Sequence, residues 1–146
     1  KFDQYFNDLY EYFSNEAWDV YPDTIPTLKR LKDIGFNVVI TSNFDSRIYD
    51  VCKKFEIDQF VDHFTISSES GYSKPDKELF YLSLKKVQAK TFESIHVGDN
   101  YNLDYVPSTE IGMKSILIDR GNEFDKEIDI CISRDFSKIF EVINES

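Results

Sequence analysis

Short apolar runs alternate with amphipathic stretches along this chain. Four runs rich in β-branched residues, each bounded by turn residues, predict buried strands at 36–41, 64–67, 94–97 and 115–118, and a fifth strand is expected within 128–133. Between these runs, apolar residues recur every three to four positions, which predicts amphipathic helices. Strands that alternate with helices are typical of a parallel sheet with helices on both faces.

Capping residues predict where several helices begin. Asp23 is expected to cap a helix that ends at Gly35, and Pro75 is expected to start a later one. Asp104 is expected near the N-cap of a short helix. Residues 1–14 and 136–143 also have helical periodicity, and we interpret the aromatic face of the first as a packing surface rather than a cofactor site.

Composition narrows the classes of function. The chain has 146 residues, which suits one domain, and its 17 Lys and Arg against 27 Asp and Glu give a net charge of −10. This charge argues against nucleic acid or an anionic membrane as partner. No apolar run is long enough for a transmembrane helix. Cys52 and Cys131 match no metal-site spacing, so we expect reduced thiols in a cytoplasmic protein.

Polar residues follow three consecutive predicted strands. Ser42 and Asn43 can donate hydrogen bonds to phosphate oxygens, and Lys74 supplies a positive charge for an anion. Asp99 and Asp104 provide oxygen ligands of the kind that Mg²⁺ prefers. Because the carboxyl ends of parallel strands meet at one edge of a sheet, these groups are expected to converge there. Together they predict phosphoryl transfer.

Each of these residues alone also has a structural explanation, as a turn, a helix cap or a solvated lysine. Their joint order along the chain favours the functional interpretation. His96 lies inside a predicted strand, and we interpret it as a packed core histidine because no second nitrogen ligand for a metal is evident.

The same residues resemble three motifs of the haloacid dehalogenase superfamily. These are Ser42-Asn43 after an apolar strand, Lys74-Pro75-Asp76, and Gly98-Asp99 followed four residues later by Asp104. Segments 20–23, 41–47 and 96–101 are similar to one group within that superfamily. The resemblance implies a three-layer, Rossmann-like α/β fold. It also implies a Mg²⁺-dependent phosphatase that, when intact, acts on a small phosphorylated substrate, and in which Ser42 binds the transferred phosphoryl group.

The resemblance implies roles for the other candidates too. Lys74 would neutralise the charge of the phosphoryl group, Asp99 would bind Mg²⁺, and Asp104 would support the metal or orient Lys74. Carbon–halogen hydrolysis also occurs in the superfamily, but an implied cation favours phosphoryl chemistry. A phosphoacceptor receiver domain carries similar groups in a different order, with its acidic pair first, and is disfavoured for that reason.

One motif of the superfamily is missing. Its first strand ends in Asp-x-Asp, where the first Asp is the nucleophile and a metal ligand, and no Asp-x-Asp occurs in this chain. We therefore expect a sheet that lacks the first central strand, with residues 1–17 as a remnant of a helical cap and 18–146 as the core domain. Covalent catalysis needs a nucleophile, so we expect no phosphatase activity from this chain alone.

The missing strand would leave two unpaired apolar edges, next to the strands at 36–41 and 94–97. A second copy could lend a strand as a homodimer, a bound N-terminal fragment could complete the sheet, or the two edges could close on each other. The chain begins with Lys1, and we expect it to be a fragment. The alternative to a phosphatase is a catalytically dead relative that acts as a binding module.

Overall fold

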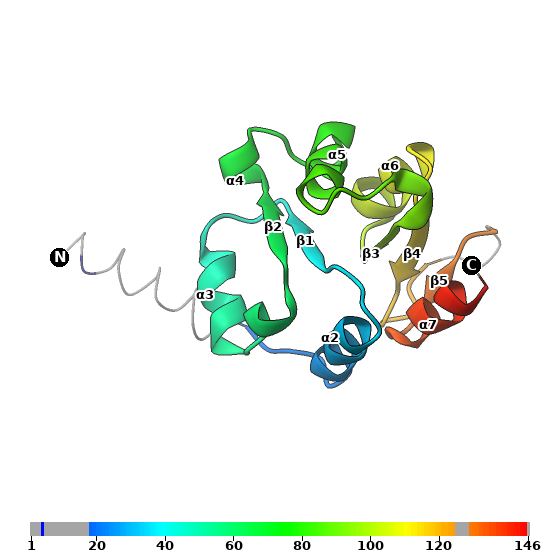
Figure 1. The fold of residues 1–146 in the computed structure, drawn as a ribbon, viewed down its shortest axis with the longest axis horizontal. Coiled ribbons are helices and arrows are strands. Elements are labelled where there is room, and N and C mark those ends of the chain that lie inside the picture. The colour runs from blue at the N-terminus through cyan, green and yellow to red at the C-terminus, as the bar shows by residue number, and fades with distance from the viewer. Residues whose placement is uncertain (1–3, 5–17, 125–128, 146) are drawn as a thin grey trace.

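The computed structural model describes residue 4 and residues 18–124 and 129–145 of the chain (Figure 1). The strands are β1 (Val39–Ser42), β2 (His63–Ile66), β3 (Ile95–Gly98), β4 (Lys114–Ile118) and β5 (Ile132–Ser133). The α-helices are α2 (Thr24–Asp33), α3 (Arg47–Lys54), α4 (Ser67–Ser70), α5 (Lys77–Lys86), α6 (Val106–Glu110) and α7 (Ser137–Asn144). All predicted strands are confirmed, with shifted ends. The helix predicted over 1–14 lies outside the described residues.

The strands form two parallel sheets instead of one. β1 pairs with β2, while β3, β4 and β5 form a separate group in that order. Every pairing is parallel, as the alternation of strands and helices predicted. Within the described part of the chain, β1 and β3 are not paired with each other. The expectation of parallel strands is therefore confirmed, and among the described residues no strand pairs with both β1 and β3.

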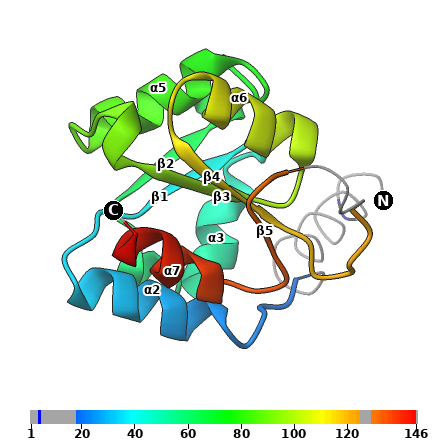
Figure 2. The ribbon, with the colours of Figure 1, turned by 90° about the vertical axis from the view of Figure 1, so that its right-hand side faces the viewer.

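Helices cover both faces of the strands. Figure 2 shows α5 and α6 on one face and α2, α3 and α7 on the other. The core beside β4 contains Ile116, Ile118 and Ile139, which are between 1% and 8% exposed. A strand that packs helices on both faces is apolar on both faces, and Ile116, Leu117 and Ile118 of β4 form such a buried apolar run. The three-layer α/β fold is thus confirmed.

Two helix starts differ from the prediction. The Asp23 side chain does not cap α2; its carboxylate binds the Arg120 guanidinium at 2.9 Å and accepts the Phe136 backbone N–H at 3.0 Å. The Asp23 carboxylate therefore binds Arg120 and Phe136, which are distant in the sequence, instead of the N–H groups of its own helix. Helix α5 begins at Lys77, two residues after Pro75, because its N-cap is Asp76.

The remaining described features concern the thiols and membrane association. No helix within 18–124 or 129–145 combines the length and apolarity that crossing a bilayer requires. Both Cys52 and Cys131 are free thiols, as the sequence predicted. Burial, with a smaller effect from the negative charge of Asp58, raises the pKa of the Cys52 thiol to about 11. Cys52 is therefore uncharged at neutral pH, which suits packing rather than nucleophilic chemistry.

Candidate active site

The end of β1 places Ser42 and Asn43 at the carboxyl edge of its sheet. The Ser42 Oγ accepts a hydrogen bond from the Phe44 N–H at 3.1 Å, which leaves its own hydrogen free to donate. The Asn43 side chain binds the backbone of Lys74 twice: Nδ2 donates to the Lys74 carbonyl at 2.9 Å, and Oδ1 accepts from the Lys74 N–H at 2.6 Å. These two bonds fix the loop that carries Lys74, so Asn43 is placed to position the lysine.

The Lys74 ammonium reaches the turn after β3. Its Nζ donates to Oδ1 of Asp104 at 2.5 Å, and the two side chains are only 14% and 4% exposed. The His96 Nε2 lies 3.0 Å from the same oxygen. The second oxygen of Asp104, Oδ2, accepts the Asn100 N–H at 3.2 Å. Both oxygens of this carboxylate are therefore occupied by donors.

Asp104 lies next to Tyr105, the N-cap of α6, as predicted, but the Asp104 side chain does not cap that helix. Asp104 lies inside a π-helical turn, Tyr101–Tyr105, that leads into α6. Asn100 provides the cap, since its Oδ1 accepts the Leu103 N–H at 2.9 Å. Because the Asn100 side chain accepts a backbone N–H at the start of this turn, the Asp104 side chain is not needed as a cap and can bind Lys74 instead.

Burial and ion pairing have opposite effects on the pKa of Asp104. Burial raises this pKa, but the hydrogen bonds from His96 and Lys74 and the positive charge of Lys74 outweigh burial and lower it to about 2. Asp104 is therefore an anion at neutral pH, held against a cationic lysine. The pair keeps Lys74 in a fixed position at the edge of the sheet.

Gly98 makes room for Asp104 at the end of β3. A Cβ added at Gly98 would lie 2.3 Å from the Asp104 Cγ and 2.7 Å from its Oδ2. Non-bonded heavy atoms do not approach each other this closely in proteins. A glycine is thus required here by the close approach of a buried carboxylate.

Replacing Gly98 by alanine is expected to lower the free energy of unfolding by about 1–3 kcal/mol, because the Asp104 side chain must shift away from Lys74. Urea denaturation measures this loss. The control is Gly121→Ala, whose added Cβ would meet only the flexible Glu123 side chain, at 3.0 Å or more. Equal losses in the two variants would contradict the tight contact at Gly98.

Asp99 differs sharply from Asp104. Its side chain is exposed at the end of β3, and within the described residues it forms no hydrogen bond or ion pair. Mg²⁺ commonly keeps several water ligands and binds one or two carboxylates together with substrate phosphates. Asp99 fits such a ligand, whereas the occupied oxygens of Asp104 favour orientation of Lys74. No cluster of three metal-ligating side chains occurs among the described residues.

His96 has a role that the sequence did not predict. Its ring packs against Phe80 with centroids 4.9 Å apart, which agrees with a core histidine, but it also contacts Asp104. A signal was present in the sequence. Residues two apart in a strand share a face, so His96 lies on the same face as Gly98, where the carboxylate of Asp104 fits.

Comparison with known proteins identifies the family. The family described as haloacid dehalogenase-like hydrolase matches residues 2–106. The chain belongs to this family. The matched range includes the ends of β1 and β3, Lys74 and Asp104, so the resemblance inferred from the sequence motifs is confirmed.

The relatives agree with this assignment. Haloacid dehalogenase-like hydrolase domain-containing protein 3 of Bos taurus is 31% identical over 111 residues, which cover 75% of this chain and 44% of the relative. Glyceraldehyde 3-phosphate phosphatase of Methanocaldococcus jannaschii is 36% identical over 110 residues, or 75% of this chain and 48% of the relative. The chain thus spans about half the length of these proteins.

A solved structure shows the same fold. A HAD phosphatase from Thermococcus onnurineus superposes with a TM-score of 0.81 and 22% identity, over 86% of this chain and 58% of the other. The arrangement of strands and helices in this chain is therefore that of haloacid dehalogenase-like proteins.

Proposed function

We propose that this chain forms the phosphate-binding and Mg²⁺-binding part of a phosphatase that acts on small phosphorylated substrates. One observation carries the proposal: Asn43 and Asp104 hold Lys74 at the edge where β1 ends in Ser42 and Asp99 follows β3. A fixed cation, a free hydroxyl and a free carboxylate at one edge suit a phosphoryl group and its counterion. The phosphatase name of one relative supports the same chemistry.

Each residue has a distinct role in this proposal. The Ser42 hydroxyl donates to a phosphoryl oxygen, and the Lys74 ammonium neutralises negative charge on that group. Asp99 holds Mg²⁺, which when bound supplies further positive charge to the phosphoryl oxygens. Asp104 positions Lys74 through their ion pair, and His96 acts through its contact with Asp104. Neither residue contacts the substrate.

A second candidate is a binding module without catalysis. The observation that favours it is the absence of Asp-x-Asp from the chain, since the remaining side chains include no activated nucleophile at this edge. Both candidates share the phosphate site. They differ in whether a nucleophilic carboxylate is supplied to that site from outside the described residues.

We expect the purified chain to bind inorganic phosphate in the presence of Mg²⁺ but not to hydrolyse p-nitrophenyl phosphate. Phosphate is the product of hydrolysis and suits the proposed ligands Ser42 and Lys74, whereas turnover needs a nucleophile that these side chains do not supply. Phosphorus NMR titration measures the binding, and absorbance of p-nitrophenol measures turnover. Robust Mg²⁺-dependent turnover would refute the assigned lack of a nucleophile, and absence of phosphate binding would refute the proposed site.

A further inference from the structure

Three aromatic rings pack together beside the proposed phosphate site. The rings of Tyr101 and Tyr105 are stacked, with centroids 5.8 Å apart and an angle of 15° between their planes. The ring of Phe124 packs against Tyr101 with centroids 5.0 Å apart. We call these three residues the aromatic cluster. All three are partly exposed, so the cluster is part of the surface and not of the buried core.

Hydrogen bonds hold the aromatic cluster from two sides. The Tyr105 hydroxyl accepts the Cys131 N–H at 3.1 Å, which ties its ring to the segment before β5. Asp119 directly follows β4, and its two carboxylate oxygens accept the Glu123 N–H at 2.9 Å and the Phe124 N–H at 3.0 Å. These two N–H groups lower the pKa of Asp119, so the carboxylate is charged at neutral pH and holds the turn that carries Phe124. The positions of Tyr105 and Phe124 are therefore fixed by the protein itself.

The aromatic cluster lies at the same edge of the sheets as the proposed ligands. Tyr101 follows Asp99 by two residues. Asn100 lies between them and donates its N–H to Oδ2 of Asp104, which fixes the backbone here. Phe124 lies in the loop that leaves the carboxyl end of β4, the parallel neighbour of β3, and the carboxyl ends of parallel strands share one edge. Tyr101 therefore lies beside the proposed Mg²⁺ ligand, on the side of β4.

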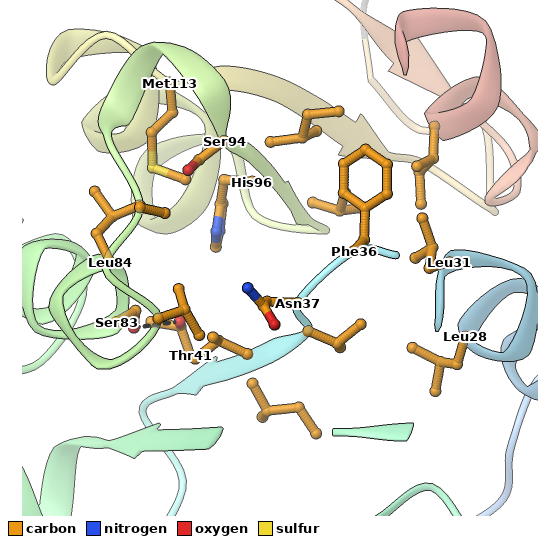
Figure 3. A pocket seen from close by; sticks show the side chains of 18 of the residues that line it. Leu28, Leu31, Phe36, Asn37, Thr41, Ser83, Leu84, Ser94, His96 and Met113 are labelled. Atoms are coloured by element: carbon orange, nitrogen blue, oxygen red, sulfur yellow. Dashed lines mark hydrogen bonds between the residues drawn. The ribbon is translucent and has the colours of Figure 1, made fainter. Parts of the chain in front are cut away.

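The cavity between the two sheets extends in the opposite direction. It has a volume of about 770 Å³, and among the residues that the structure describes its lining includes none of the proposed ligands of phosphate or Mg²⁺. Figure 3 shows Phe36 and Asn37, which precede β1, and also Ser94 and Met113, which directly precede β3 and β4. The cavity thus reaches the amino ends of the strands. A phosphate ester bound at the carboxyl ends needs another surface for its organic part.

An aromatic ring suits the organic part of a substrate and not its phosphate. The face of the ring carries partial negative charge, which disfavours an anion. A second ring packs favourably against an aromatic side chain, either offset or edge to face. A side chain that its neighbours already hold loses little conformational entropy when a ligand packs on it. The aromatic cluster is therefore a preformed surface for a ring.

We propose that Tyr101, supported by Phe124, determines substrate specificity: it contacts the ring of a phosphate ester whose alcohol carries a sugar or aromatic ring. This role rests on the function proposed above, with phosphate bound at Ser42 and Lys74. The Cα atoms of residues two apart are separated by at most about 7 Å. A ring bonded to a phosphate beside Asp99 can therefore reach the aromatic cluster.

The test uses the purified chain with Mg²⁺ and three probes: inorganic phosphate, methyl phosphate and phenyl phosphate. Phenyl phosphate is expected to bind about threefold to tenfold more tightly than methyl phosphate, as isothermal titration calorimetry measures. In Tyr101→Leu, which keeps an apolar side chain against Tyr105 but removes the ring, the ratio of these two affinities should fall to about one. Tyr101→Phe keeps the ring and should retain the ratio. Because both esters share the phosphate site, weakening that site alone does not change the ratio.

Proton NMR and a second variant test the contact itself. The phenyl protons of bound phenyl phosphate should show nuclear Overhauser effects to the rings of Tyr101 and Phe124, because these rings lie in contact. Phe124→Leu should lower the affinity ratio by about twofold or more. A cluster that only packs against the protein would give neither result.

Phe92→Ala is the control for exposed aromatic rings in general. Phe92 is 68% exposed and lies in the turn Thr91–Glu93, at the amino end of β3 and so at the opposite edge from Tyr101. Its replacement should leave the affinity ratio of phenyl phosphate to methyl phosphate as it is in the unmodified chain.

The three probes separate failure of this role from failure of the phosphate site. If inorganic phosphate binds but the two esters bind equally well, the specificity role of Tyr101 is refuted and the phosphate site stands. The same holds if Tyr101→Leu keeps the ratio, or if Phe92→Ala lowers it as much. If none of the three probes binds, the proposed phosphate site is refuted, and the role of Tyr101 with it.

Discussion

Replacing Asp104 by asparagine is expected to lower the free energy of unfolding at neutral pH by about 3 kcal/mol. The substitution preserves the shape of the side chain but removes the negative charge of the carboxylate that Lys74 and His96 both contact. The asparagine places an N–H₂ donor where a carboxylate oxygen accepted hydrogen bonds. At least one of the three groups that contact this carboxylate, from Lys74, His96 and Asn100, therefore loses its partner. Urea denaturation, followed by circular dichroism, measures the loss.

Asp99→Asn is the matched control for this prediction. It makes the same chemical change five residues away, at an exposed carboxylate without a hydrogen bond or ion pair within the described part of the chain. Its effect on stability is expected to stay within about 0.5 kcal/mol. Equal destabilisation by the two variants would show that the buried ion pair does not stabilise the turn after β3.

The Asp104 carboxylate is also expected to make the free energy of unfolding depend on pH in the acid range. The pKa of Asp104 is about 2 in the folded chain, below the ordinary value of 3.8, so the folded state binds this proton less readily than the unfolded state. The resulting stability, about 2 kcal/mol, is fully present above about pH 4 and is lost as the pH falls through 2. Asp104→Asn should lack this part of the acid dependence, whereas Asp99→Asn should retain it.

Replacing Lys74 by methionine is expected to weaken binding of inorganic phosphate by about tenfold to a hundredfold. A hydrogen bond to a charged group contributes about 1.5–3 kcal/mol, and each 1.4 kcal/mol is a factor of ten in affinity. The Lys74 side chain is already fixed by Asp104, so little conformational entropy is lost when phosphate binds. Phosphorus NMR titration in the presence of Mg²⁺ measures the change, after circular dichroism has shown that the variant is folded.

Lys77→Met separates this local effect from a change of net charge. Lys77 lies three residues further along the chain and pairs with Glu110 on the surface, where both side chains are about half exposed. Its replacement removes the same charge and should leave phosphate affinity nearly unchanged. A similar loss in both variants would mean that phosphate responds to the overall charge of the chain and not to a site at Lys74.

The fold followed from the sequence because its main signals are local. Apolar runs and helical periodicity predicted every strand within the described residues, and the parallel order followed from their alternation. The gap between β1 and β3 was predicted only from the resemblance to a family with an additional strand. No pattern within the chain itself marks a neighbour that the chain does not contain.

The details of the site did not follow from the sequence, because they depend on contacts between distant residues. Lys74 and Asp104 are 30 positions apart, and no local pattern shows that they form an ion pair. Asn43, which we predict to bind phosphate, also binds the backbone of Lys74, 31 positions away, with both polar atoms of its side chain. Asp23 similarly pairs with Arg120 instead of capping α2. Local capping preferences contribute only about 1 kcal/mol, and a buried or partly buried charge pair can outweigh them.

The most direct measurement is the phosphate affinity of the chain with and without Mg²⁺, compared with that of Asp99→Asn. If Asp99 holds a cation beside a phosphate bound by Ser42 and Lys74, Mg²⁺ should tighten phosphate binding by about tenfold or more, and Asp99→Asn should lose this gain while keeping the weaker binding. Isothermal titration calorimetry measures the phosphate affinity both with and without Mg²⁺. Phosphate affinity that does not depend on Mg²⁺, or that gains equally from Mg²⁺ in Asp99→Asn, would contradict a shared metal and phosphate site at the ends of β1 and β3.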